Sequence, residues 1–159
     1  MIDRLFYGSL IILACMYVLP VLIKFLKKYR TKKRIKQLAS NSAEITPKEF
    51  LKYRKDILSR NRNTIQRANF EGVYIIHNVS KDLFYVGQAQ RILDRLNQHF
   101  TGHGNGDVYA DYKYGDKFTI RTIALRKSGF KTLNELERNA IETYDACKKG
   151  CNKTKGNFD

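Results

Sequence analysis

Six residues between positions 74 and 152 have side chains of the types that phosphodiester cleavage requires: Tyr74, Tyr85, Arg95, His99, Glu137 and Asn152. Such cleavage needs an activated water, positive charge on the developing phosphorane and stabilisation of the leaving oxygen. The Glu137 carboxylate suits Mg²⁺ or Mn²⁺, because such an ion keeps most of its waters and needs only one or two protein carboxylates. The planar guanidinium of Arg95 can hold a phosphate in a fork. His99 and Tyr74 are candidates for relaying the proton from the attacking water.

The order and spacing of these residues carry more information than their types. Each one alone has a plain structural explanation, such as a surface arginine, a core tyrosine or a glutamate on a helix face. Tyr74 ends the string Gly72-Val73-Tyr74, and Tyr85 opens the string Tyr85-Val86-Gly87. Arg95 follows Tyr85 by ten residues, and His99 follows by four more. Arg95 and His99 therefore share one face of a helix and can point at one phosphate.

The two strings and the ordered residues after them resemble the GIY-YIG nuclease family, over about Gly72 to Asn157. Valine replaces isoleucine in both strings, and Cys151 in Gly150-Cys151-Asn152 stands where the family usually carries tyrosine. The resemblance implies a small antiparallel sheet with flanking helices, a DNA substrate and cleavage that depends on a divalent metal.

The resemblance also implies a role for each matching residue. It makes Tyr74 the general base, aided by His99, and places Tyr85 beside the attacking water and the phosphate. It makes Arg95 the phosphate clamp. The roles implied for the remaining matches are metal ligation by Glu137, substrate positioning or ordering of the site by Asn152, and close passage of the backbone past DNA at Gly87. Which tyrosine takes the proton stays open at this point.

Hydrophobic patterning around these residues predicts an α+β fold with a small three-stranded antiparallel sheet. Gly72 to Asn78 and Leu83 to Gly87 are short apolar strands separated by a turn, so they form a hairpin in which the Tyr74 and Tyr85 rings can lie near each other. The expected order is β-β-α-β-α-α. Residues can be assigned to three of the elements after the hairpin: a helix at 91–100, a strand at 118–125 and a helix that a capping box opens at 132–135 and that ends near 144.

Two segments between the expected elements have more than one interpretation. Thr101 to Asp107 has three glycines, which disfavour a regular element, and forms either a mobile loop over the substrate groove or a plain surface connection. Val108 to Tyr114 has three tyrosines and a lysine, which form either a contact surface for nucleic acid or packing side chains.

The N-terminal part of the chain contains 19 successive uncharged residues, from Leu5 to Ile23. As a helix they extend roughly 28 Å, close to the hydrocarbon thickness of a bilayer. A buried core helix would show a polar face, and a signal peptide would have a basic start and a shorter apolar run. The run therefore predicts an uncleaved transmembrane helix.

Basic residues after this run predict its orientation. Eight of the thirteen residues from Lys24 to Lys36 are basic and none is acidic, which favours a cytoplasmic location for everything that follows. The same residues would attract anionic lipids. We expect a single-pass cell-membrane protein with three parts: residues 1–36 as transmembrane helix and basic juxtamembrane segment, 37–69 as linker and basic helix, and 70–159 as nuclease-like domain.

The linker is predicted to be irregular from Leu38 to Ile45. A helix then starts at Thr46-Pro47-Lys48-Glu49, with Thr46 as its cap, and runs to about Arg67. Its lysines and arginines make it either a solvated spacer or a segment that grips DNA or the membrane surface. Cys147 and Cys151, like Cys15, lack the partners of a zinc site and are expected to be small apolar residues in a reducing cytosol.

Together these features predict a membrane-anchored, Mg²⁺- or Mn²⁺-dependent DNA endonuclease. Two alternatives are an inactive, membrane-tethered nucleic-acid-binding module and a membrane scaffold that works through its basic linker. The first does not explain why all the site residues are present, and the second leaves them unexplained altogether. About 120 residues after the N-terminal segment leave little room for a separate DNA-recognition module, which argues against a long specific site. No protein partner is indicated.

Overall fold

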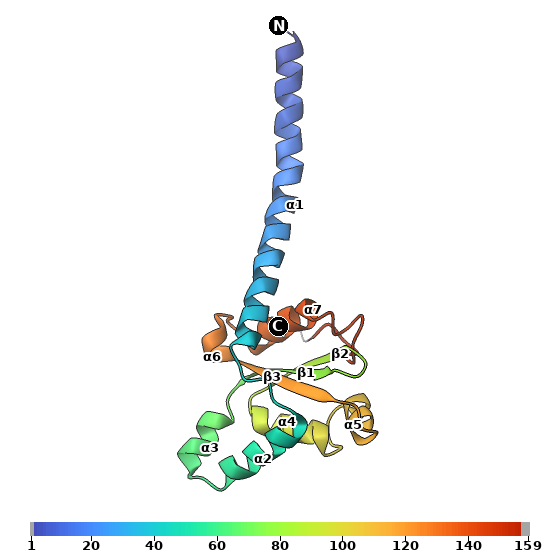
Figure 1. Ribbon diagram of the computed structural model, residues 1–159. Coiled ribbons are helices and arrows are strands. Elements are labelled where there is room, and N and C mark those ends of the chain that lie inside the picture. Colours follow the sequence, from blue (N-terminus) through green and yellow to red (C-terminus); the bar gives the residue numbers. More distant parts are fainter. Residues whose placement is uncertain (1, 157–159) are drawn as a thin grey trace. The chain divides into compact units, whose positions relative to one another are not determined.

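The computed structural model describes the backbone of residues 2–156 and the side chains of residues 16–156. The chain divides into two compact units, Met1–Arg34 and Ile35–Asp159. Figure 1 shows the helices and strands with their labels. The site residues predicted from the sequence all lie in the second unit.

Helix α1 (Ile2–Ser40) contains Pro20 and provides the regular structure of the first unit. The expected span from Leu5 to Ile23 lies partly outside the described residues, because side chains are described only from Met16 onward. Among the parts that are described, no helix combines the length and the apolar character needed to cross a membrane. The prediction of a transmembrane helix is therefore not confirmed.

The second unit is built on a three-stranded antiparallel sheet, as predicted. Strands β1 (Gly72–Asn78), β2 (Leu83–Ala89) and β3 (Phe118–Ala124) lie in the order β2-β1-β3, so β2 is an edge strand. In the hairpin, Gly72 pairs with Ala89 and Asn78 with Leu83. Successive side chains along a strand point to opposite faces, so this register decides which face each site residue occupies.

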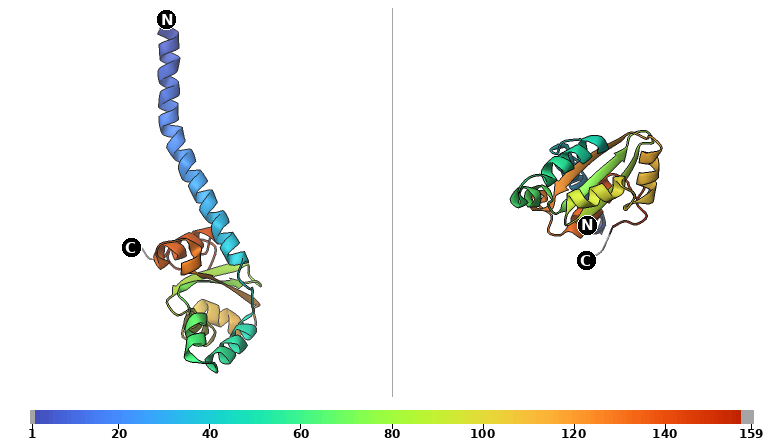
Figure 2. Two further views of the ribbon diagram at one scale, coloured as in Figure 1. Left: turned by 90° about the vertical axis from the view of Figure 1, so that its left-hand side faces the viewer. Right: turned by 90° about the horizontal axis from the view of Figure 1, so that it is seen from below.

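Helices cover both faces of the sheet (Figures 1 and 2). Each face has its own apolar core. On one face, α7 (Leu133–Thr143) and the last turns of α1 pack on side chains that include Val73, Ile75 and Val86. On the other face, α2 (Pro47–Leu58) and α4 (Ile92–Phe100) pack on Tyr74, Ile76 and Ile120. Because β1 buries apolar side chains on both of its faces, helices pack on both sides of the sheet and the unit has three layers.

The linker differs from its prediction at two places. Helix α1 continues to Ser40, so only part of 38–45 is irregular, and Ile45 forms a bridge with Ile120. The Thr46 capping box is confirmed, but the expected single helix to Arg67 is wrong. It divides into α2 and α3 (Arg62–Ala68), because the Asn61 side chain accepts the backbone N–H of Thr64 and starts a new helix.

Two short helices were not predicted. Helix α5 (Gly106–Lys113) begins within the glycine-rich segment, because Asn105 caps it by accepting the N–H of Val108. Helix α6 (Leu125–Ser128) directly follows β3. Helix α7 starts at the predicted cap, where Thr132 accepts the N–H of Glu135.

Candidate active site

The hairpin register places Tyr74 and Tyr85 on one face of the sheet. Tyr74 lies directly opposite Gly87, and Ile76 lies opposite Tyr85, so the two tyrosines are diagonal neighbours with ring centroids 6.2 Å apart. A Cβ atom at residue 87 would overlap the Tyr74 hydroxyl. Gly87 is therefore required here because the Tyr74 ring lies over it. The sequence instead led us to expect that glycine at position 87 lets the backbone pass close to DNA.

His99 lies under the two tyrosines and is fully buried. Helix α4 carries it against the sheet, with its ring centroid 5.2 Å from that of Tyr74 and 4.9 Å from that of Tyr85. Its Nε2 lies 2.8 Å from the Tyr74 hydroxyl. Its Nδ1 accepts the backbone N–H of Asn105 at 2.9 Å.

Arg95 lies one helical turn before His99 and is half-buried. Its Nη1 donates to Gln98 Oε1 at 2.7 Å. The positive charge of Arg95 lowers the pKa values of Tyr74 and Tyr85 and that of His99, so the guanidinium lies close to all three rings. The predicted common face of Arg95 and His99 is thus formed around the tyrosines.

Burial decides the protonation of this cluster. It raises the pKa of both tyrosines and lowers the pKa of His99 to about 4. The neighbouring Tyr85 raises the pKa of Tyr74 further. At neutral pH, His99 and both tyrosines are therefore uncharged, and Arg95 is the cation among them.

Glu137 reaches the site from the opposite layer. It lies on α7 with 8% of its surface exposed, and Gln88 donates to its Oε2 at 3.1 Å. Gln88 also donates to Asn134 Oδ1 at 2.7 Å. Because Gln88 follows Gly87 in β2, its side chain points to the α7 face and fixes the Glu137 carboxylate. Gln88 and Asn134 were not predicted from the sequence. The one available signal was the position of Asn134, three residues before Glu137 on the same helix, which puts the two side chains on one face.

Asn152 closes the free edge of β2. Its Oδ1 accepts the N–H of Val86 at 2.8 Å, and its Nδ2 donates to the carbonyl of Val86 at 2.7 Å. One residue earlier, the N–H of Cys151 donates to the carbonyl of Phe84 at 3.0 Å. The segment after α7 thus continues the hydrogen bonding of the sheet. These contacts support the second of the two roles expected for Asn152, that it orders the site.

A polar cavity of about 240 Å³ lies at this edge. Its lining joins residues from the hairpin, α7 and the C-terminal segment: Tyr85, Val86, Asn105, Glu137, Ile141, Asn152, Lys153, Thr154 and Gly156. Lys153 and Thr154 were not predicted, and no pattern in the sequence marks them. Tyr74, Arg95 and His99 do not line the cavity, and Tyr85 is the residue that connects them to it.

The side-chain oxygen atoms around this cavity are ligands of the kind that a hard divalent cation prefers. Among the described lining residues they are one carboxylate, the hydroxyl oxygens of Tyr85 and Thr154, and the side-chain amides of Asn105 and Asn152. Within residues 16–156, no group of three or more His, Cys, Asp or Glu side chains could hold a metal ion. A set with one carboxylate fits Mg²⁺ or Mn²⁺, which keep most of their waters, and does not fit a structural zinc ion. Cys147 and Cys151 are free and half-buried, and the Cys15 side chain lies outside the described residues.

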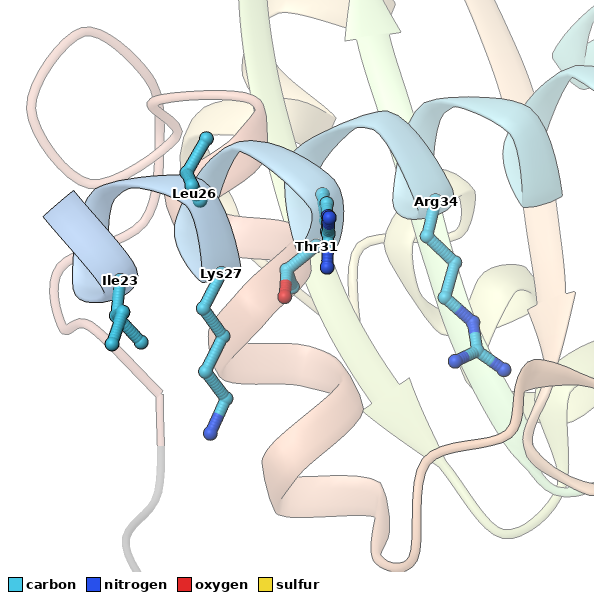
Figure 3. Close-up of a pocket in the computed structure, with 6 residues that line it drawn as sticks. Ile23, Leu26, Lys27, Thr31 and Arg34 are labelled. Carbon is cyan, nitrogen blue, oxygen red and sulfur yellow. The ribbon is translucent and has the colours of Figure 1, made fainter.

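A hollow of about 430 Å³ runs along α1 in the first unit, and Figure 3 shows the side chains around it. Its lining carries three basic residues and no acidic one: Ile23, Leu26, Lys27, Arg30, Thr31 and Arg34. None of the predicted site residues lies there, so the candidate active site is the cavity at the β2 edge.

Comparison with known families agrees with this geometry. The sequence model of the GIY-YIG catalytic domain matches residues 70–152, which is more than half of the 159-residue chain. The chain therefore belongs to the GIY-YIG family and carries a nuclease domain. No curated protein and no solved structure matches the chain.

Proposed function

We propose that this member of the family is a DNA endonuclease that hydrolyses phosphodiester bonds with the help of Mg²⁺ or Mn²⁺. One observation carries the proposal: Tyr85 and Glu137, from opposite layers of the domain, line one polar cavity beside Arg95, His99 and Tyr74. A structural role alone does not require a carboxylate with 8% of its surface exposed to be held beside a tyrosine hydroxyl.

The residues divide the chemistry according to their positions. Glu137 would hold the divalent ion, which when bound supplies positive charge for the phosphate and the leaving oxygen. Arg95 offers a planar fork for the scissile phosphate. Tyr85 lines the cavity, which favours it as the hydroxyl next to the attacking water, whereas Tyr74 is 1% exposed and lies behind it. Tyr74, which the sequence led us to expect as the general base, would therefore act through Tyr85 and not on the water directly.

The first experiment is a cleavage assay with the purified full chain. Supercoiled plasmid, single-stranded DNA and branched DNA are incubated with Mg²⁺, with Mn²⁺ or with a chelator. We expect cleavage of at least one substrate that the chelator abolishes. Binding without cleavage would identify an inactive nucleic-acid-binding module. Neither binding nor cleavage would favour a scaffold that works through its basic segment.

We also propose that the domain is held at the cytoplasmic face of the cell membrane. The support comes from the uncharged run Leu5–Ile23 and the eight basic residues after it. The described part of the run presents large apolar side chains outward, among them Tyr17 at 73% and Val21 at 66% exposure. A nuclease in that position would meet incoming DNA, such as phage, plasmid or transforming DNA. This role fails if cells that lack the N-terminal helix handle incoming DNA no differently from cells that have it.

A further inference from the structure

The loop between α4 and α5 lies directly against the imidazole of His99. The backbone N–H of Asn105 donates to His99 Nδ1 at 2.9 Å. A Cβ atom on the preceding Gly104 would lie 2.6 Å from Nδ1 and 2.7 Å from the His99 Cα, closer than such atoms approach. The loop therefore needs glycine at 104 in order to bring the next N–H to the ring. The sequence left open whether this segment was a mobile loop over the substrate groove or a plain surface connection; in the structure it contacts His99 directly.

The donor at Nδ1 determines where the imidazole proton lies. A backbone N–H can donate only to a ring nitrogen that carries no proton, so Nδ1 is the acceptor. In the neutral ring the proton is then on Nε2, which lies 2.8 Å from the Tyr74 hydroxyl oxygen. His99 is thus the donor in this hydrogen bond and Tyr74 the acceptor.

We propose that His99 acts as a fixed hydrogen-bond donor to Tyr74, and that Gly104 and Asn105 are positioning residues that hold it in this form. The inference rests on the proposed nuclease function and adds to it. Nδ1 is occupied by the N–H of Asn105, and Nε2 already carries a proton. His99 cannot take a proton from Tyr74 in this arrangement, so the proton relay predicted from the sequence does not pass through it.

The direction of this hydrogen bond matters for the cavity. Because the Tyr74 oxygen accepts from His99, the Tyr74 hydrogen points away from the imidazole, and the Tyr85 ring is a neighbour of Tyr74 with centroids 6.2 Å apart. The donors run from Asn105 through His99 to Tyr74, whose neighbour Tyr85 lines the cavity. Negative charge that develops on the tyrosine pair is stabilised by these donors and by Arg95, whose charge lowers the pKa of both tyrosines.

The loop is anchored on both sides of the contact. The Asn105 Oδ1 caps α5 by accepting the N–H of Val108, and its Nδ2 donates to the carbonyl of Cys151 at 3.4 Å. Cys151 precedes Asn152, which closes the edge of β2. Asn105 therefore ties together α5, the histidine and the segment that borders the cavity. Such a connection can hold one tautomer throughout the reaction.

The direct test is the tautomer of His99 in the full chain, measured by nitrogen NMR on histidine-labelled protein. The chain has three histidines, so the His99 signal can be assigned with one variant. We expect an unprotonated Nδ1 and a protonated Nε2 near neutral pH. A protonated Nδ1, or an averaged signal from both tautomers, would overturn the proposal. The result does not depend on cleavage, so it remains informative if the chain proves to have no nuclease activity.

Variants at position 105 then separate the N–H from the side chain. The backbone angle φ of Asn105 is −74°, which proline can adopt. Asn105→Ala removes the helix cap but keeps the N–H, whereas Asn105→Pro removes both. We expect Asn105→Ala to keep the tautomer and Asn105→Pro to lose it, with cleavage about tenfold slower than in the alanine variant, as the loss of one hydrogen bond implies. Equal tautomer signals in the two variants would contradict the positioning role.

Variants of His99 itself separate a donor from a base. Glutamine can place an amide donor near the Nε2 position but cannot accept a proton at neutral pH. We expect His99→Gln to retain activity within roughly tenfold of the native chain, and His99→Ala to fall by roughly 10²–10³, the cost of removing one preorganised donor. If the glutamine variant is folded and as inactive as the alanine variant, His99 works as a base and the proposal is wrong.

Discussion

At the scale of single residues, Glu137 provides the sharpest test of the site. Among the described residues that line the cavity, Glu137 is the only carboxylate; Glu137→Gln removes it at almost unchanged volume, and the new amide can still accept from Gln88. We expect Mg²⁺-dependent plasmid cleavage to be abolished, while DNA binding and the thermal midpoint stay near those of the native chain. Glu142→Gln, at an exposed position on the same helix, is the matched control. Cleavage at the native rate by Glu137→Gln would remove Glu137 from the metal site.

Arg95 tests how the phosphate is held. Arg95→Lys replaces a planar fork by a point charge, so we expect cleavage to fall by roughly 10²–10³ with little loss of DNA binding. Arg91→Ala is the comparison, because Arg91 is exposed and pairs with Asp94 at 2.8 Å, away from the tyrosines. Single-turnover rates of the two variants give the measurement. An equal loss in both would mean that the wrong arginine has been assigned.

His99 makes stability depend on pH. Its pKa of about 4 in the folded chain lies below the ordinary histidine value near 6.5. The unfolded chain therefore binds more protons between about pH 6.5 and about pH 4, and the free energy of unfolding falls as the pH drops through this window. Urea unfolding at both ends of the window should show a smaller fall for His99→Gln than for the native chain.

The residues that the sequence predicted and those it missed differ in how they are encoded. Tyr74, Tyr85, Arg95 and His99 lie close together in the chain, so local periodicity places them on the hairpin and on one helix face. Their proximity in the fold could therefore be predicted. The contacts that Gln88, Lys153 and Thr154 make depend on how distant segments pack, and no local pattern records them. The same holds for the close approach of the Tyr74 ring to Gly87.

At the scale of elements, the sheet was predictable and the connections were not. Two short apolar runs and one alternating segment identify the three strands, and Thr46 and Thr132 mark the starts of α2 and α7. Helix α5 was missed because the glycines of its loop received more weight than the cap at Asn105. The helix after Pro47 was predicted too long because Asn61 was not recognised as a second cap.

Asn152 connects the C-terminal segment to β2, and its removal tests that element. Asn152→Ala loses two hydrogen bonds to the backbone of Val86, which should lower the free energy of unfolding by roughly 1–3 kcal/mol in a urea titration. Cleavage should fall as well, because the same segment borders the cavity. Asn63→Ala, at an exposed position on α3, should change stability by at most about 0.5 kcal/mol. If the two variants are equally stable, the C-terminal segment does not depend on Asn152.

At the scale of the whole molecule, the positive charge is distributed unevenly along the chain. Residues 1–70 carry 16 basic and 4 acidic side chains, whereas residues 71–159 carry 14 and 11. The nuclease domain is therefore close to balanced, and the excess positive charge lies before it. A surface of this sign attracts phosphate groups, whether in DNA or in lipid headgroups, with a strength that falls as salt rises.

Salt separates attachment by charge from attachment by an apolar helix. If the proposed membrane location is right, the chain should fractionate with membranes and resist extraction by high salt and by alkali, because screening weakens surface charges but not a buried apolar segment. A reporter fused after Asp159 should be cytoplasmic. The double variant Val18→Lys with Val21→Lys should move to the soluble fraction, whereas Lys32→Gln with Lys33→Gln should remain with the membranes. An extracellular reporter, or a mature chain that begins near Leu19, would identify Leu5–Ile23 as a signal peptide. The nuclease would then act on external DNA rather than on DNA that enters the cell.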